Sequence, residues 1–301
     1  MSAAVSVCAI LVSYHPDLAA LDTAFASVAP QVSALVVVDN ASDVVIGETG
    51  NITVLRQPVN VGVAAAHNVG IEWARNAGHT HVLMLDQDSV PGLGMVAELV
   101  RAWRALSARG RVGAVGPRFR DSREARDAPF VRVGFPMSKK LWCDGSAPYI
   151  RTDFLISSGA LISLEALDDI GTMDERLFID NVDMEWSFRA RALGYGLYGV
   201  CAATMSHLLG DERVPVFGGR AEIVRHSPVR LYYIMRNRVE LYRRPHTPRV
   251  WVAQDLPRVV IKFLIFSVLI GPRRRNVRYM VRGLADGMRR RLGPCSIEAR
   301  A

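Results

Sequence analysis

Apolar and polar positions alternate in blocks along the first 120 residues, and these blocks predict strands and helices in turn. Continuous apolar, β-branched runs predict strands at 5–14, 34–38, 52–55, 81–85 and 112–115. Apolar residues at helical spacing predict helices over 17–29, through 67–74 and over 96–108. Such alternation is typical of a doubly wound, mostly parallel α/β sheet, and strands that are apolar throughout agree because parallel strands are covered on both faces.

Beyond residue 117 the pattern is less regular. The charged stretch 118–127 predicts a loop, and residues 178–179 form a short apolar strand. Further segments predict two strands and one helix, at 154–163, 195–202 and 183–193. Apolar clusters separated by arginines follow, and we expect them to be helical. We therefore predict one α/β domain over 1–220 and a helical, basic C-terminal region over 221–301.

Composition excludes several classes of protein. The chain has 301 residues, 50% hydrophobic and 22% charged, so it is globular rather than disordered. The four cysteines lie far apart without a CxxC pair, which argues against a disulfide framework or a zinc knuckle. We expect four thiols in a reducing compartment. The N-terminal apolar stretch lacks a basic region before it, and no run reaches 18 apolar residues, so we expect neither export nor a membrane span.

The net charge of +8 is unevenly distributed. From residue 221 onward there are 18 Lys and Arg against five Asp and Glu, whereas residues 1–220 carry 19 against 24. Apolar clusters at 259–270 precede arginines between 273 and 291. This combination predicts a segment on an anionic membrane surface, although a helical hairpin with a solvated basic face has the same pattern. No nucleic-acid-binding signature is present, so we expect no nucleic acid partner.

Two predicted strands end in carboxylates, where open α/β sheets bind their ligands. Asp39 follows one strand, and Asp86-Gln87-Asp88 follows another. Alternate residues of an extended segment point the same way, so Asp86 and Asp88 can converge on one hard cation. This predicts a divalent metal that bridges the acids to a diphosphate; the alternative is an ordinary polar turn.

Two further segments carry candidate chemistry. Small residues in 60–70 let a helix start approach a ligand, and its N-terminus would favour a phosphate, although a tight Gly/Ala turn has the same composition. In 178–186, three acids begin a helix, and one could act as a general base. Alternatively, Asp183 caps the helix and Glu185 favours its first turn. His207 is a metal ligand or a surface histidine.

Together these motifs resemble the family 2 inverting glycosyltransferases of GT-A fold. The resemblance covers nearly the whole chain and rests first on 36–40, 60–70, 83–88 and 183–186. Within the family the chain looks like the bacterial rhamnosyltransferases, on 86–89, 154–159, 177–183, 232–237 and 283–288. Val182 stands before Asp183 where the commoner pattern is Glu-Asp, and the rhamnosyl branch is similar in this.

The resemblance implies a role for each matched residue. Asp183 would be the catalytic base, and the metal ligands would be Asp86, Asp88 and His207. The nucleotide-sugar-binding residues would be Asp39, Asn40, Asn60, Gly62, Asn68, Asp86 and Arg236. The acceptor side would be formed by Ser158, Gly159, Glu185 and Trp186.

The implied activity is inverting, Mg²⁺- or Mn²⁺-dependent transfer of L-rhamnose from dTDP-L-rhamnose to a hydroxyl. The acceptor would be a membrane-associated glycan or glycolipid, either an O-antigen or cell-wall intermediate or a rhamnolipid. The protein would be cytoplasmic and peripheral on the inner face of the bacterial cytoplasmic membrane. Alternatives are another donor (a UDP-hexose or UDP-galactofuranose), a nucleotidyltransferase, or a non-catalytic membrane adaptor. The first strand is not followed by the Gly-rich basic loop of a nucleotidyltransferase, which argues against that enzyme class. The presence of all four acids, at 39, 86, 88 and 183, argues against a non-catalytic adaptor.

Overall fold

A nine-stranded sheet forms the centre of the computed structural model, which describes residues 4–48, 50–120, 127–207, 213–216 and 221–295. Its strands are β1 (Val7–Ser13), β2 (Ala34–Asp39), β3 (Ile52–Arg56), β4 (His81–Asp86), β5 (Ser89–Pro91), β6 (Val112–Arg120), β9 (Tyr149–Thr152), β10 (Leu161–Ser163) and β11 (Gly196–His207). Their order is β3-β2-β1-β4-β10-β6-β11-β5, and β9 also pairs with β11. β10 runs antiparallel to both neighbours, so β3, β2, β1, β4, β6 and β11 share one direction.

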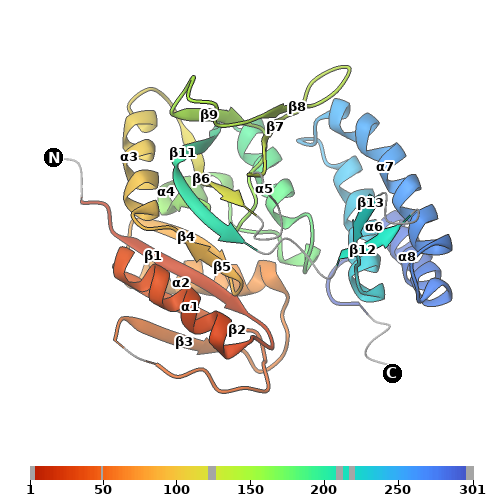
Figure 1. The fold of residues 1–301 in the computed structure, drawn as a ribbon, viewed down its shortest axis with the longest axis horizontal. Helices are drawn as coiled ribbons and strands as arrows, with labels where there is room; N and C mark the ends of the chain where they lie inside the picture. Colours follow the sequence, from red (N-terminus) through yellow and green to blue (C-terminus); the bar gives the residue numbers. More distant parts are fainter. Residues whose placement is uncertain (1–3, 49, 121–126, 208–212, 217–220, 296–301) are drawn as a thin grey trace.

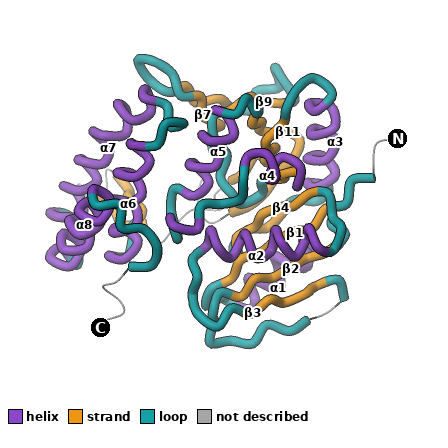
Figure 2. Tube along the Cα trace, turned by 180° about the vertical axis from the view of Figure 1, so that it is seen from behind, coloured by secondary structure: helices purple, strands orange, loops and turns teal. Residues whose placement is uncertain are grey.

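Helices cover both faces of this sheet (Figures 1 and 2). They are α1 (Leu18–Val28), α2 (Val63–Asn76), α3 (Met95–Ser107), α4 (Leu164–Ile170) and α5 (Val182–Ala192), with short 3₁₀ turns η1 (Ala29–Gln31) and η2 (Glu175–Leu177). In β1, Ile10 packs in the core with α2, α4 and α5, while Leu11 packs in the core with α1 and α3. Both faces of the strand are therefore buried, which explains its unbroken apolar run and confirms the predicted doubly wound sheet.

The C-terminal region is helical, as predicted, and lies beside the sheet in Figure 1. A hairpin of β12 (Arg213–Val216) and β13 (Ala221–Val224) precedes α6 (Pro228–Arg243), α7 (Arg249–Val268) and α8 (Arg273–Met288). A Cβ on Gly283 of α8 would collide with the Tyr232 carbonyl of α6, so glycine permits their close packing. None of the helices described is long and apolar enough to cross a membrane. The predicted boundary at residue 220 falls outside the described residues.

Three local predictions are wrong. Of the strand expected over 154–163, only Leu161–Ser163 forms, and Ser163 then caps α4 by accepting a hydrogen bond from the Ala166 amide (3.1 Å). Arg118 and Arg120 extend β6 instead of forming a loop, and both pair with Asp127; residues 121–126 lie outside the described structure. Residues 178–179 form a turn rather than a strand, since Phe178 has a φ of +66°.

The prediction of four thiols is also wrong. Cys143 lies close to a short hairpin of β7 (Phe130–Arg132) and β8 (Lys139–Leu141), and it forms a disulfide with Cys201 of β11. Cys8 and Cys295 are buried thiols outside this disulfide, as expected for small apolar side chains. The pairing of Cys143 and Cys201 was not predictable from spacing, because 58 residues separate them.

Candidate active site

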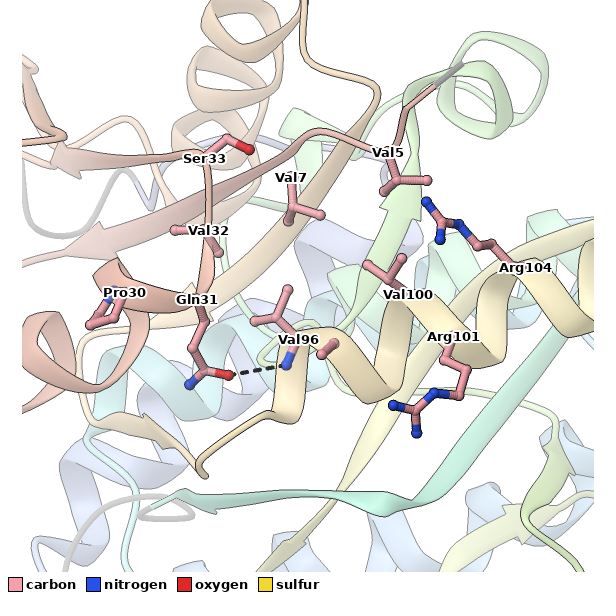
Figure 3. Close-up of a pocket in the computed structure, with 11 residues that line it drawn as sticks. Val5, Val7, Pro30, Gln31, Val32, Ser33, Val96, Val100, Arg101 and Arg104 are labelled. Carbon is pink, nitrogen blue, oxygen red and sulfur yellow. Dashed lines mark hydrogen bonds between the residues drawn. The ribbon is translucent and has the colours of Figure 1, made fainter. Parts of the chain in front are cut away.

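Two cavities of similar size lie at opposite ends of the parallel strands. One, of about 550 Å³, lies where β1 begins, between η1 and α3 (Figure 3). Its lining is mostly apolar, with polar groups such as Gln31 and two arginines, and none of the described residues that line it carries a carboxylate. The Gln31 Oε1 accepts a hydrogen bond from the Val96 amide. The other, of about 560 Å³, lies at the carboxyl ends of β1, β2 and β4 and contains the acids expected from the sequence. We therefore assign the second cavity as the candidate active site.

The turn after β4 brings Asp86, Gln87 and Asp88 into the wall of this cavity. The Gln87 side chain accepts a hydrogen bond from the Tyr14 amide (2.7 Å), which ties the turn to the end of β1. Behind the turn, the buried Ser158 hydroxyl accepts from the Asp86 amide (3.2 Å) and contacts the Ser89 hydroxyl. The Gly159 amide donates to the Met84 carbonyl (2.7 Å), so Ser158 and Gly159 support the acidic turn from behind.

Asp183, in the first turn of α5, faces the same cavity. Burial raises the pKa of its carboxyl to about 6, and the charges of Asp180 and Asp86 add to this, against a hydrogen bond from the Met184 amide. A carboxylate with a raised pKa suits a general base that works near neutral pH. The N-cap of α5 is Asn181, so Asp183 is not the capping residue of this helix.

The charges that line the cavity are mostly negative. In the described part of its wall, the carboxylates of Asp86, Asp88, Asp180 and Asp183 meet one guanidinium, that of Arg230 on α6. Arg230 contacts Asp180 at 3.3 Å. A diphosphate would be repelled here unless a cation accompanied it, and oxygen ligands of this kind fit Mg²⁺ or Mn²⁺.

Among residues with a described placement, no three potential ligands come together. The pairing of β11 with β5 places the His207 backbone opposite Ser89, next to Asp88 in the chain. The His207 side chain lies outside the described structure. Its predicted role as a ligand therefore stays a prediction.

The start of α2 forms a second wall. The Asn40 side-chain Nδ2 donates to Asn60 Oδ1 (2.9 Å), which also accepts from the Gly62 backbone amide. Asn40 Oδ1 accepts from the Val61 backbone amide. Gly62 has a φ of +85°, and a Cβ there would lie 2.6 Å from the Phe178 ring. These contacts turn the chain so that the first amides of α2 border the cavity.

Asp39 is buried directly behind this wall. Its carboxylate accepts a hydrogen bond from the Ser42 amide (3.1 Å) and lies 3.7 Å from the Arg56 guanidinium. It ends β2 as predicted but does not line the cavity.

Four predicted site residues are placed away from the cavity. Asn68 binds both the amide and the carbonyl of Met173. Glu185 is buried in ion pairs with Arg189 and Arg244, and its carboxylate lies 3.0 Å from His246 Nε2. The Trp186 indole donates to the Gly171 carbonyl (2.9 Å), and Arg236 is completely buried. Each of these side chains supports the segments around the site from within the protein.

Sequence reasoning assigned no role to Arg230, Tyr14 or Phe178, although all three line the cavity. Arg230 belongs to a helix that begins 45 residues after Asp183. No local motif marks it, and the basic surplus of the C-terminal region was its only signal. Phe178 was read as part of a strand, so its role in the turn was missed.

The chain is similar to known proteins in both sequence and fold. Residues 8–170, more than half of the chain, match the family described as Glycosyl transferase family 2. The chain belongs to this family. This glycosyltransferase is 28% identical over 293 residues to "dTDP-rhamnosyl transferase RfbF" of Shigella flexneri, covering 94% of this chain and 96% of that protein. It is 26% identical over 263 residues to "Galactofuranosyltransferase GlfT1" of Mycolicibacterium smegmatis, covering 79% and 83%.

Solved structures confirm the GT-A fold. The glycosyltransferase superimposes on GalNAc-T7, crystallised with UDP, GalNAc and Mn²⁺, with a TM-score of 0.59 at 14% identity. The match covers 96% of this chain and 57% of GalNAc-T7. At this identity the likeness concerns the fold, that is, the mostly parallel central sheet with helices on both faces.

Proposed function

We propose that this glycosyltransferase transfers L-rhamnose from dTDP-L-rhamnose to a hydroxyl group, with inversion at the anomeric carbon. The observation that carries the proposal is a partly buried base, Asp183, which shares one cavity with the acidic turn Asp86–Asp88. The similarity to RfbF, which extends over 94% of the chain, supports rhamnose as the sugar.

In this proposal Asp183 accepts the proton of the acceptor hydroxyl, whose oxygen attacks the anomeric carbon from the face opposite the nucleotide. The C–O bond to the diphosphate breaks as the new glycosidic bond forms. Asp86 and Asp88, with His207 as a further candidate, would hold Mg²⁺ or Mn²⁺, and the ion would offset the charge of the leaving diphosphate. Asn40, Asn60 and Gly62 shape the wall that borders the donor, and Asp39 supports it from behind.

We propose that the acceptor is carried by a membrane, because one face of α7 is apolar and exposed. Leu256, Val260, Ile261, Leu264 and Val268 are each about half exposed and lie on one side of the helix. Exposed arginines follow at the start of α8, at 273, 274 and 275. An apolar stripe beside basic residues fits the surface of an anionic bilayer, where each basic residue contributes about 1 kcal/mol. The enzyme would then be peripheral on the cytoplasmic face.

The second candidate donor is UDP-galactofuranose, which the 26% identity to GlfT1 favours. With this donor the catalytic base and the acidic turn would be the same. Only the groups that contact the nucleobase and the sugar of the donor would differ.

The proposal is tested by incubating the enzyme with radiolabelled dTDP-L-rhamnose, Mn²⁺ and bacterial membranes that contain lipid-linked glycans. We expect label in the lipid extract with the wild type and none with Asp183→Asn. The exposed residue Asp22 of α1 provides a matched control, because Asp22→Asn removes a carboxylate that does not line the cavity. Equal labelling by wild type and Asp183→Asn would contradict the assignment of the base.

A further inference from the structure

The loop that presents Asp183 has a backbone that local forces disfavour. In this segment, residues 176–181, three non-glycine residues have a positive backbone φ, between +63° and +66°: Phe178, Asp180 and Asn181. Non-glycine residues rarely adopt this region, and a run of them persists only where the surroundings determine it. Because α5 begins directly after the loop, any change in its backbone moves Asp183.

Asn237 of α6 lies beneath this loop and is completely buried. Its Nδ2 lies within hydrogen-bond distance of three loop carbonyls, those of Leu177 (3.0 Å), Ile179 (2.8 Å) and Asp180 (2.8 Å). Only the nitrogen end of the amide can donate to these oxygens. The two N–H groups of this amide are thus shared among carbonyls on both sides of Phe178 and directly before Asn181, where the backbone turns.

Arg236 orients this amide and adds contacts of its own. Its Nε donates to Asn237 Oδ1 (2.9 Å), which leaves Nδ2 facing the loop. Its terminal nitrogens contact the carbonyls of Leu177 (2.8 Å), Arg176 (3.2 Å) and Gly293. The guanidinium lies over the Tyr233 ring, 4.8 Å from its centroid, and is fully buried. Arg236 and Asn237 therefore form one rigid unit on α6.

The same loop contacts the start of α2 on its other side. The Phe178 carbonyl accepts a hydrogen bond from the Ala64 amide (3.3 Å). The Phe178 ring stacks on the Tyr233 ring of α6, with 5.0 Å between the two ring centroids. The loop is thus held between the wall of the cavity and α6, and both neighbours are needed to define it.

We propose that Asn237 and Arg236 are positioning residues for the transfer reaction. They fix the carbonyls of residues 176–181, and through this backbone they place the carboxylate of Asp183 in the cavity. Helix α6 is accordingly part of the machinery that orients the base. The kinetic test of this inference rests on the proposed function. The placement of the loop by Asn237 is tested separately, without a donor.

The matched control is Asn276, at the start of α8. It is also completely buried, and its Nδ2 also donates to two backbone carbonyls, those of Phe266 (3.2 Å) and Ile270 (2.9 Å). These carbonyls belong to the last turn of α7 and to the turn that follows it, and neither residue lines the cavity. Asn276→Ala therefore removes a comparable set of hydrogen bonds without touching the loop of Asp183.

The first measurement is amide hydrogen exchange of the full chain without ligands. Asn237→Ala should speed exchange in peptides that cover 177–185, and Asn276→Ala should speed it only around 266–276. If Asn237→Ala left protection of 177–185 unchanged, the inference would be wrong, whatever the donor. Should Asn237→Ala not accumulate in folded form, Asn237→Ser, which keeps one donor, is measured by the same criteria.

The second measurement separates placement of the base from binding of the donor. It follows the release of dTDP from dTDP-L-rhamnose with Mn²⁺ and with the bacterial membranes that supply the acceptor hydroxyl, alongside calorimetric binding of the same donor. We expect Asn237→Ala to lower kcat at least tenfold with a donor Kd within threefold of the wild type, and Asn276→Ala to change neither. An unchanged kcat, or a Kd weakened as much as kcat, would overturn the inference. No release by the wild type would instead refute the proposed donor, and the exchange measurement would still decide.

Discussion

Replacing the base should make the protein more stable as well as inactive. The carboxyl of Asp183 has a pKa near 6 in the folded protein, mainly because burial disfavours its charge, against an ordinary value of 3.8. The folded state therefore binds the proton more tightly than the unfolded chain does. Stability is lost as the pH rises from 3.8 to about 6, and the loss is complete above that window.

The magnitude follows from these two values. One pKa unit corresponds to about 1.4 kcal/mol, so ionised Asp183 destabilises the fold by about 3 kcal/mol at pH 8. Asparagine carries no charge and avoids this penalty. For a chain of this length, such a change raises Tm by about 5 °C.

Thermal unfolding of wild type and Asp183→Asn, with EDTA present so that no cation shifts the carboxyl, measures this directly. We expect the variant to unfold at a higher temperature at pH 8 and the difference to vanish near pH 4. Asp22→Asn, at an exposed position, should show no such pH dependence. A difference in Tm that is absent at pH 8, or constant from pH 4 to 8, would refute the reasoning. Release of dTDP should fall by about 10²- to 10⁴-fold in Asp183→Asn.

Three further outcomes follow from the structure. Asp88→Ala should abolish the Mn²⁺ dependence of dTDP-rhamnose binding measured by calorimetry, and unchanged dependence would exclude Asp88 as a ligand. Leu264→Asp, on the exposed face of α7, should reduce co-sedimentation with phosphatidylglycerol vesicles, whereas Leu93→Asp, at an exposed leucine outside α7, should not. If both variants bound the vesicles equally, the apolar face of α7 would be excluded as the membrane contact. Glu185→Ala removes a buried carboxylate that pairs with both Arg189 and Arg244, and it should cost about 3 kcal/mol in denaturant unfolding, with donor affinity unchanged. A loss of donor affinity without a loss of stability would instead restore Glu185 to the site.

The sheet and the acidic turn could be predicted because their signals are local. β1, β2 and β4 are buried on both faces, so each strand appears as an unbroken apolar run. The carboxylates that end β2 and β4 then stand out as polar residues at the edge where ligands bind. By contrast, residues 154–160 are apolar enough to resemble a strand, but they form a loop, and only Leu161–Ser163 pairs with the sheet.

The residues that complete the site were not predictable because their partners are distant in the chain. Asn237 lies 57 positions from Asp180, and Arg230 lies 50 positions from it. The family resemblance alone assigns Arg236 to the donor. In the structure its charge faces backbone carbonyls instead, since α6 passes beneath the loop of Asp183. A charged residue in a motif can thus act on the fold of the site rather than on the ligand.

The central claim is tested most directly by a panel of sugar nucleotides. Calorimetry with Mn²⁺ would compare dTDP-L-rhamnose, UDP-galactofuranose, UDP-glucose and GDP-mannose, with Asp88→Ala and a chelator as controls. The account predicts binding of dTDP-L-rhamnose in preference to the others, lost on chelation and in the variant. Preferential binding of a UDP-sugar would contradict the assignment of rhamnose and leave the base and the fold in place.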